Sequence, residues 1–265
     1  MFLLLSQIYN INIMSNIEEL VRSNLKDNQI IVTFFNHNYR NLAKIWCEQM
    51  EKKNITNYVI IASEQSAYDA LKDNNFNLGL RVKIEKNFWT YEITVTKMIF
   101  DYGVDVIHSD LDAIWKEDAT QHMTDKNIDL YFSQGLGFPK DVFNKNGFCM
   151  CYGFWFLRNN ERTQKLFNDW VEDSFKTYDH QISINRLLVA TKWDRENVEE
   201  KKVKHIVYWN NDIYGENEAF NIKTCLLSMN KIQRLYIDEN AWIYHLSAEK
   251  VESEKFKIFE KYNIL

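Results

Sequence analysis

The feature that most constrains this chain is the alternation of short, continuously apolar segments with longer segments of helical periodicity. Ile30–Phe35, Tyr58–Ala62 and Val104–His108 are rich in β-branched and aromatic residues and contain few polar side chains. Between them, the segments 39–53 and 87–102 repeat apolar residues every three or four positions. Strands that are apolar on both faces and alternate with helices are typical of a parallel sheet covered by helices on both sides.

The second half of the chain continues this pattern with more aromatic strands. It predicts strands at 128–133, 148–157, 203–209 and 242–245, and helices at 64–71, 160–175, 179–190 and from 248 onward. Aromatic strands joined by short loops favour antiparallel pairing. With one proline and seven glycines, the sequence offers no Pro/Gly-rich linker. We therefore expect a single α/β domain with a Rossmann-like, mixed central sheet flanked by helices.

Charge and cysteine content narrow the possible partners. Lysine and arginine number 32 against 37 acidic residues, a net charge of −5, which argues against binding to nucleic acid through bulk charge. The four cysteines match neither a disulfide scaffold nor a zinc site, so we expect buried thiols in a reducing compartment. The apolar residues 1–5 are too few for a secretory signal or a membrane span. We predict a cytoplasmic protein without a transmembrane span, in which residues 1–14 are a dispensable extension.

Two aspartates directly follow the strand at Val104–His108. Asp110 and Asp112 flank Leu111, and in extended backbone the side chains at i and i+2 point the same way. Two carboxylates that close repel each other unless a cation lies between them. Mn²⁺ or Mg²⁺ prefers oxygen ligands and leaves positions for phosphate oxygens. The pair thus predicts a cation site for a diphosphate, and a solvated acidic turn is the alternative interpretation.

The residues around this pair resemble a known family. Over residues 97–118 the chain has a lysine, a helix and then the pattern G-x-D-V-x-x-x-D-x-D-x-x-W, which begins at Gly103 and ends at Trp115. Gly153–Arg158 is similar to a G-F-x-x-x-R strand, and His245 resembles a late histidine of the same proteins. These features resemble the nucleotide-diphospho-sugar transferase family, which includes the plant rhamnogalacturonan xylosyltransferases. The resemblance implies a type-A glycosyltransferase fold over residues 15–265.

The resemblance also implies roles for individual residues. His245 would complete a metal site with Asp110 and Asp112, although a core histidine is the alternative. The donor's phosphates and sugar would contact Lys97 and Lys250, for which solvated helix lysines are the alternative. The remaining donor-binding candidates are Thr33, Phe34, Asn36, Ser109, Asp110 and Leu111. Ordinary strand packing explains Phe34 equally well.

Three residues are candidates for a catalytic role. Gln181 and Asn185 keep the family's spacing, but His180 stands where the family usually has aspartate, and Asp179 precedes it. Gln134 occupies a position that is usually acidic in the family, where it would lie beside the sugar as a polar stabiliser. We take Asp179, Gln134 and Gln181 as the catalytic candidates, and the alternative for Asp179 is a helix N-cap.

The sequence predicts mainly core aromatics, with a few candidates for contact with sugar. Phe154, Trp155, Phe156, Trp170 and Trp193 fit a core at alternating strand or helix positions. Tyr152 and Tyr214 are the candidates for stacking on sugar.

These observations favour a metal-dependent glycosyltransferase. It would transfer a sugar from a nucleotide sugar, most simply UDP-linked, to a hydroxyl of a glycan or protein-linked glycan, with retention of configuration and with Mn²⁺ or Mg²⁺ as cofactor. Two alternatives remain open: a nucleotidyltransferase that makes a nucleotide sugar, and a non-catalytic protein that binds one. The sequence predicts no oligomeric state.

Overall fold

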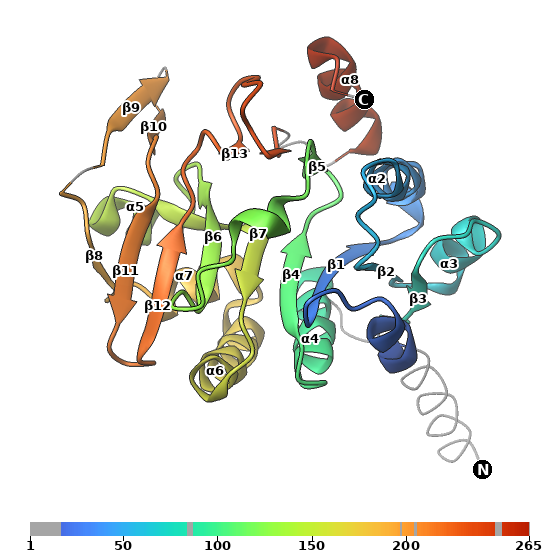
Figure 1. The fold of residues 1–265 in the computed structure, drawn as a ribbon, viewed down its shortest axis with the longest axis horizontal. Helices are drawn as coiled ribbons and strands as arrows, with labels where there is room; N and C mark the ends of the chain where they lie inside the picture. The colour runs from blue at the N-terminus through green and yellow to red at the C-terminus, as the bar shows by residue number, and fades with distance from the viewer. Residues whose placement is uncertain (1–16, 84–86, 197, 204–205, 247–250, 265) are drawn as a thin grey trace.

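The computed structural model describes residues 17–83, 87–196, 198–203, 206–246 and 251–264, so the extension predicted at residues 1–14 lies outside the described residues. The first half of the chain alternates strands and helices. After a helix at 17–23 come β1 (Gln29–Phe35), η1 (His37–Tyr39), α2 (Arg40–Lys52), β2 (Tyr58–Ala62), α3 (Gln65–Leu71), β3 (Leu78–Leu80), α4 (Phe88–Phe100) and β4 (Asp105–Ser109) (Figure 1).

The second half adds mostly short strands. The elements are β5 (Ile114–Trp115), η2 (Ala119–His122), β6 (Leu130–Gly135), α5 (Lys140–Asn146), β7 (Cys149–Leu157), α6 (Glu161–Thr177), α7 (His180–Leu187), β8 (Lys192–Trp193), β9 (Glu200–Val203), β10 (Ile206–Trp209), β11 (Ile213–Asn217), β12 (Ile222–Leu226), β13 (Ile232–Gln233), β14 (Ile243–Tyr244) and α8 (Glu252–Tyr262).

Nine strands form one mixed sheet in the order β3-β2-β1-β4-β7-β6-β12-β11-β8. The four strands from β3 to β4 are parallel, and β7 then runs antiparallel between β4 and β6. The predicted mixed α/β sheet is therefore confirmed. Because β1 and β4 are adjacent and parallel, the loops that follow them meet at one edge of the sheet, which is where open sheets bind ligands.

The sheet separates two apolar cores, one on each face. Helices α4, α6 and α7 cover one face, where Trp155, Phe167 and Trp170 are fully buried. Helices α2, α3 and α8 cover the other face around Trp46 and Trp115. This burial on both faces explains why the sequences of the central strands are continuously apolar and do not alternate between apolar and polar residues. It also confirms the core assignment of the strand and helix aromatics.

Several strands were not predicted, and they lie toward the edges of the sheet. β3, β11 and β12 were not expected, and the single strand expected at 203–209 is part of an antiparallel pair, β9 and β10. β11 and β12 are short and partly polar: β11 alternates buried with exposed residues, and β12 has one exposed residue among four buried ones. Such segments carry little signal until their neighbours are known.

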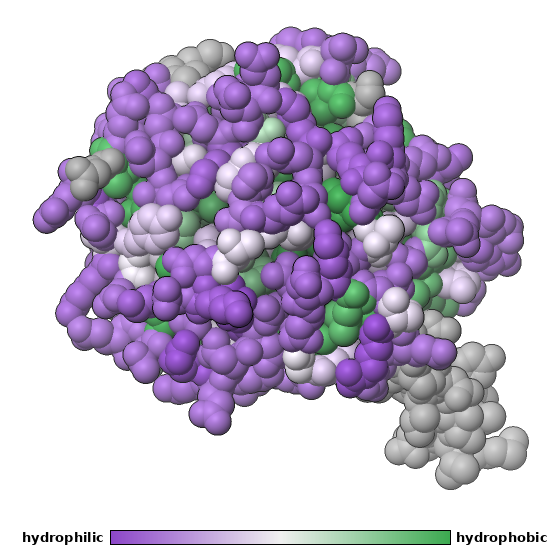
Figure 2. Space-filling model, in the orientation of Figure 1, coloured by the Kyte–Doolittle hydropathy of each residue, from purple (hydrophilic) through white to green (hydrophobic). Residues whose placement is uncertain are grey.

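Hydrophilic residues cover most of the face shown in Figure 2, and hydrophobic residues appear there in separate small areas. Within the described residues, no helix combines the length and the apolar character that crossing a bilayer requires. All four cysteines are buried and unpaired, as expected.

Gln134 has a structural place that differs from the catalytic one we expected. Its side chain is buried on β6, where Nε2 donates to the carbonyls of Trp209 and Leu227 and Oε1 accepts from the amide of Trp209. Both ends of the amide are therefore occupied by backbone, and Gln134 does not line the cavity described below. The residue joins β10 and the end of β12 to the central sheet, so the prediction that it lies beside the sugar is corrected.

Gln134→Leu should lower the free energy of unfolding by about 3 kcal/mol, because three buried backbone groups lose their partner. Urea denaturation measures this change, with the exposed Gln121→Leu as the matched control. A loss below about 0.5 kcal/mol, within the range of neutral surface changes, would show that the hydrogen bonds of Gln134 contribute little to stability.

Candidate functional site

A cavity of ≈ 770 Å³ opens at the edge of the sheet where β1 and β4 end. Phe34 and Asn36 line it from the end of β1, and Asp110 and Asp112 line it from the loop after β4. Further walls come from the first turns of α4, from β7, from the start of α7, from the segment after β13 and from α8. Its volume is within the range of small-ligand sites.

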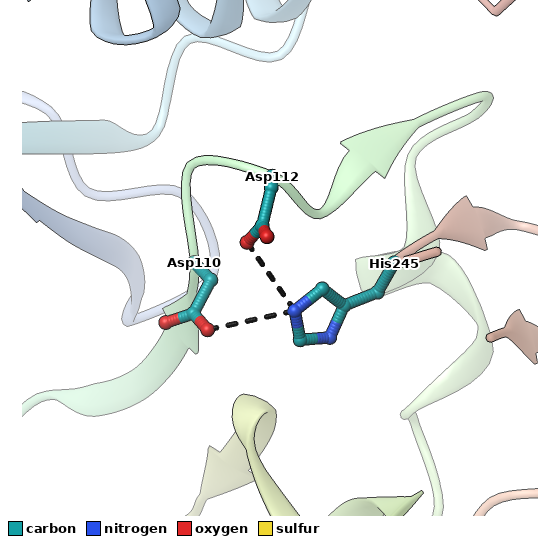
Figure 3. Close-up of side chains that lie close together, drawn as sticks. All are labelled: Asp110, Asp112 and His245. Atoms are coloured by element: carbon teal, nitrogen blue, oxygen red, sulfur yellow. Dashed lines mark ion pairs between the residues drawn. The ribbon is translucent and has the colours of Figure 1, made fainter. Parts of the chain in front are cut away.

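Asp110, Asp112 and His245 meet inside this cavity. Their ligand atoms lie within 4.8 Å of one another, and Figure 3 shows both carboxylates directed toward one nitrogen of the imidazole. His245 Nε2 is 3.5 Å from Oδ2 of Asp110 and 3.3 Å from Oδ1 of Asp112. His245 follows β14, so residues 133 positions apart in sequence converge because β14 pairs with β5, just after the aspartates.

Gly153 on β7 leaves the space that this cluster occupies. Its carbonyl accepts a hydrogen bond from the amide of Asp110 at 2.8 Å, which fixes the loop after β4. A Cβ at this position would overlap Cε1 of His245 and lie 2.6 Å from Oδ2 of Asp110. The glycine is therefore required by the close approach of the two side chains, not by an unusual backbone angle.

Neighbouring basic side chains stabilise the charged carboxylates. Lys255 of α8 forms an ion pair with Asp112, and His108 Nε2 is 3.1 Å from Oδ1 of Asp110. Burial raises the pKa of Asp110, but the His108 hydrogen bond and the charges of His108, His245 and Lys255 outweigh burial and lower it below its usual value. Burial and Arg234 lower the pKa of His245, but Asp112 outweighs both and raises it to about 9.

Arg234 and Cys151 form the wall beside His245. The guanidinium contacts Sγ of Cys151, and its Nε has no hydrogen-bond partner among the described residues. Burial raises the pKa of the Cys151 thiol, but Arg234 and His245 outweigh burial and lower it to about 7. Arg234 therefore brings a positive charge to the cavity, and part of its hydrogen-bonding capacity is unused.

The three clustered residues fit a divalent cation. Two carboxylates and one imidazole are a donor set that Mn²⁺ or Mg²⁺ accepts, and Gly153 provides the room for them to converge. Without a cation, Lys255 supplies the positive charge next to Asp112. The fit rests on the residues present, and the identity of the ion stays a proposal.

Five further donor-binding or catalytic candidates lie in the cavity wall: Phe34, Asn36, Leu111, Asp179 and Gln181. Phe34 stacks on His108 at 6.2 Å, and the side chain of Asn36 caps η1 by accepting from the amide of Asn38.

Asp179 and Gln181 both make structural contacts at the start of α7. Asp179 caps α7 through one oxygen, which accepts from the amide of Ile182. Gln181 donates to the carbonyl of Phe138 and accepts from the amide of Tyr152. These contacts give both residues structural roles at the start of α7, and their catalytic roles stay a prediction.

Other candidates do not reach the cavity. Lys97 lies in the last turn of α4 and pairs with Asp101 at 2.5 Å. Thr33 is buried within β1, and Oγ of the buried Ser109 accepts from the indole of Trp115 at 2.9 Å. The structure thus gives these three residues packing or pairing roles in place of the donor contacts we expected. Lys250 lies outside the described residues.

The structure separates the two candidates for stacking on sugar, and sequence reasoning missed two basic residues of the site. Tyr152 is buried on β7, where it lines the cavity and stacks on His180, whereas Tyr214 is exposed on β11 away from this cavity. Arg234 and Lys255 lie in the cavity wall but were not singled out. Lys255 is one of several lysines near the C-terminus, and only its distant partner Asp112 distinguishes it.

A buried acid on α4 and a buried histidine on α7 also line the cavity. Glu92 Oε2 is 3.2 Å from Nε2 of His180, and both side chains are buried. Burial, together with the charge of Asp110, raises the pKa of Glu92 well above its ordinary value. Burial also lowers the pKa of His180 well below its ordinary value, so burial favours the neutral form of both side chains.

The mixed sheet and its flanking helices have the fold of type-A glycosyltransferases. The nucleotide-diphospho-sugar transferase family matches residues 53–245, most of the chain, and the chain belongs to this family. The predicted family and the predicted class of enzyme are thereby confirmed. No protein of curated function matches the chain by sequence.

Solved glycosyltransferase structures resemble this chain to different extents. Mouse xyloside xylosyltransferase 1, in its apo form, superposes with a TM-score of 0.51 at 10% identity, covering 83% of this chain and 98% of that one. The galactosyltransferase LgtC, in complex with donor and acceptor sugar analogues, gives a TM-score of 0.44 at 13% identity, covering 59% and 69%. GlyE of Streptococcus pneumoniae gives 0.41 at 14% identity, covering 60% and 43%.

Gly153→Ala should weaken Mn²⁺ binding by about tenfold to a hundredfold, because the new methyl group displaces His245 from the carboxylates. Isothermal titration with Mn²⁺ measures the affinity. Gly215→Ala is the matched control, since its Cβ would meet Trp193 at 2.6 Å in the same sheet but away from the cluster. Equal Mn²⁺ affinity in the Gly153 variant and the wild type would contradict the assigned role of the glycine.

Glu92→Gln should change how stability depends on pH. The folded protein keeps the Glu92 proton above the ordinary pKa of 4.5, whereas the unfolded chain loses it. The contribution of Glu92 is therefore complete below pH 4.5 and is lost as the pH rises. Between pH 5 and 7 the free energy of unfolding of the wild type should fall relative to the variant by up to about 1.4 kcal/mol per pH unit.

Urea denaturation of both proteins at several pH values tests this prediction. The comparison cancels the titration of His180, which is present in both. A difference that stays constant from pH 5 to 7 would show that Glu92 is ionised in the folded state.

Proposed function

We propose that this protein is a metal-dependent glycosyltransferase that transfers a sugar from a UDP-linked donor to a hydroxyl group of a glycan or protein-linked glycan, with retention of configuration. The observation that carries the proposal is the convergence of Asp110, Asp112 and His245 in one cavity. Membership of the nucleotide-diphospho-sugar transferase family supports a nucleotide sugar as the donor. The resemblance to retaining xylosyltransferases supports retention of configuration at the anomeric carbon.

The residues of the cluster would hold Mn²⁺ or Mg²⁺ against the donor's diphosphate. When bound, the cation neutralises negative charge on the departing diphosphate. Arg234 and Lys255 line the same cavity, and their positive charges support the proposal that they contact phosphate oxygens. Arginine suits this task because its guanidinium can donate two parallel hydrogen bonds to a phosphate.

In the transfer step, the acceptor oxygen forms a bond to the anomeric carbon while the bond from that carbon to the diphosphate oxygen breaks. The proton of the acceptor hydroxyl passes to the departing diphosphate. This route is supported by the carboxylates in the cavity: burial favours the protonated form of Glu92, which is bonded to His180, and Asp110 and Asp112 face the imidazole of His245. The protein then contributes mainly position and charge, which suffice for a reaction whose leaving group takes the proton.

UDP binding that requires Mn²⁺ tests the proposed donor site. Asp112→Asn keeps the shape of the side chain but removes its charge, so UDP affinity in the presence of Mn²⁺ should fall by about tenfold or more. Arg234→Gln should weaken UDP binding by about tenfold, the weight of one charge-assisted hydrogen bond. Isothermal titration of UDP with and without Mn²⁺ gives both values.

Two variants control for the loss of charge alone. Asp141→Asn and Arg22→Gln alter exposed ion pairs that do not line the cavity, so UDP affinity should stay at the wild-type level. Release of UDP from a panel of UDP-sugars then identifies the donor. UDP binding that is equally strong without Mn²⁺, or unaffected by Asp112→Asn, would contradict the proposed metal site.

A further inference from the structure

Two aromatic rings at the mouth of the cavity are unusually exposed. Trp89 is 45% exposed and Phe138 is 50% exposed, and both line the same cavity as Asp110 and His245. Trp89 lies in the first turn of α4, and Phe138 lies in the loop between β6 and α5. Exposed apolar rings in a concave site are costly unless a ligand covers them, so their position indicates a binding surface.

Both rings are held in place from the start of α7. The side chain of Asn87 donates to the carbonyl of Tyr178 at 2.5 Å, and the ring of Trp89 lies 6.3 Å from that of His180. On the other side, the carbonyl of Phe138 accepts from Gln181 at 3.0 Å. The two rings thus belong to segments far apart in sequence, and each segment contacts residues at or just before the start of α7.

Polar groups lie next to the rings. Asp179 lines the cavity, and while its Oδ1 caps α7, no hydrogen bond to its Oδ2 is found among the described residues. A pyranose ring has an apolar face of C–H groups and a rim of hydroxyls, so it requires an aromatic surface with an acceptor beside it. Trp89 and Phe138 provide the aromatic surface, and Asp179 provides the acceptor. A wholly apolar ligand would leave Asp179 without a partner, and a charged ligand would leave the two rings uncovered.

We propose that Trp89 and Phe138 form the acceptor subsite and that its occupant is a neutral pyranose ring whose hydroxyl is bonded by Asp179. This inference rests on the proposed function, because the same cavity would hold the donor diphosphate at Asp110, Asp112 and His245. A ring stacked at the mouth lies between solvent and the donor. The remainder of a longer glycan would then extend out of the cavity.

The test uses the full chain with Mn²⁺, the UDP-sugar found to be hydrolysed, and a panel of p-nitrophenyl pyranosides as acceptors. Trp89→Ala and Phe138→Ala should each raise the KM of the pyranoside by about tenfold, while the KM of the donor changes by less than about twofold. Trp89→Phe should recover most of the loss. Phe175→Ala and Tyr214→Ala remove rings of similar exposure, 46% and 49%, outside the cavity and should leave the pyranoside KM at the wild-type value.

Two results would overturn the subsite while leaving the proposed function intact. One is a wild-type enzyme that hydrolyses the UDP-sugar and releases UDP no faster when any pyranoside is added. The other is an unchanged pyranoside KM in both Trp89→Ala and Phe138→Ala. A wild-type protein that neither binds nor hydrolyses any UDP-sugar would instead contradict the proposed function itself.

Discussion

The site depends on holding two like charges close together at the end of one strand. Asp110 and Asp112 repel each other, and the structure opposes this repulsion with His108, His245 and Lys255, each contributed by a different element. Because Gly153 lacks a side chain, the imidazole can approach both carboxylates at once. A site that gathers charge in this way is prepared for a cation, because a divalent ion replaces several weaker compensating contacts by one strong interaction.

Much of this arrangement could be predicted from local sequence. Continuous apolar runs identified β1, β2 and β4, and the spacing of Asp110 and Asp112 after β4 placed two carboxylates on one side of the backbone. These features are local, since they depend on residues a few positions apart and on the general rule that ligands bind beyond the carboxyl ends of parallel strands. His245 was reached only through resemblance to a family.

The features that could not be predicted depend on contacts between distant segments. Gln134 has the composition expected of a polar site residue, yet its partners are backbone groups of β10 and of the residue after β12. Arg234 and Lys255 are ordinary charged residues in sequence, and only the fold brings them to the cavity. The same holds for Trp89, whose exposure beside α7 follows from how α4 packs. Side-chain type suggests chemistry, but tertiary packing decides whether that chemistry is used.

The central claim is that Asp110, Asp112 and His245 bind a divalent cation together. A crystal structure of the protein grown with Mn²⁺ and UDP, with anomalous data collected for manganese, tests it most directly. The account predicts an anomalous peak about 2.0–2.3 Å from an oxygen of each aspartate and from a ring nitrogen of His245. A diphosphate bound in the cavity without manganese at these three residues, while Lys255 still pairs with Asp112, would contradict it.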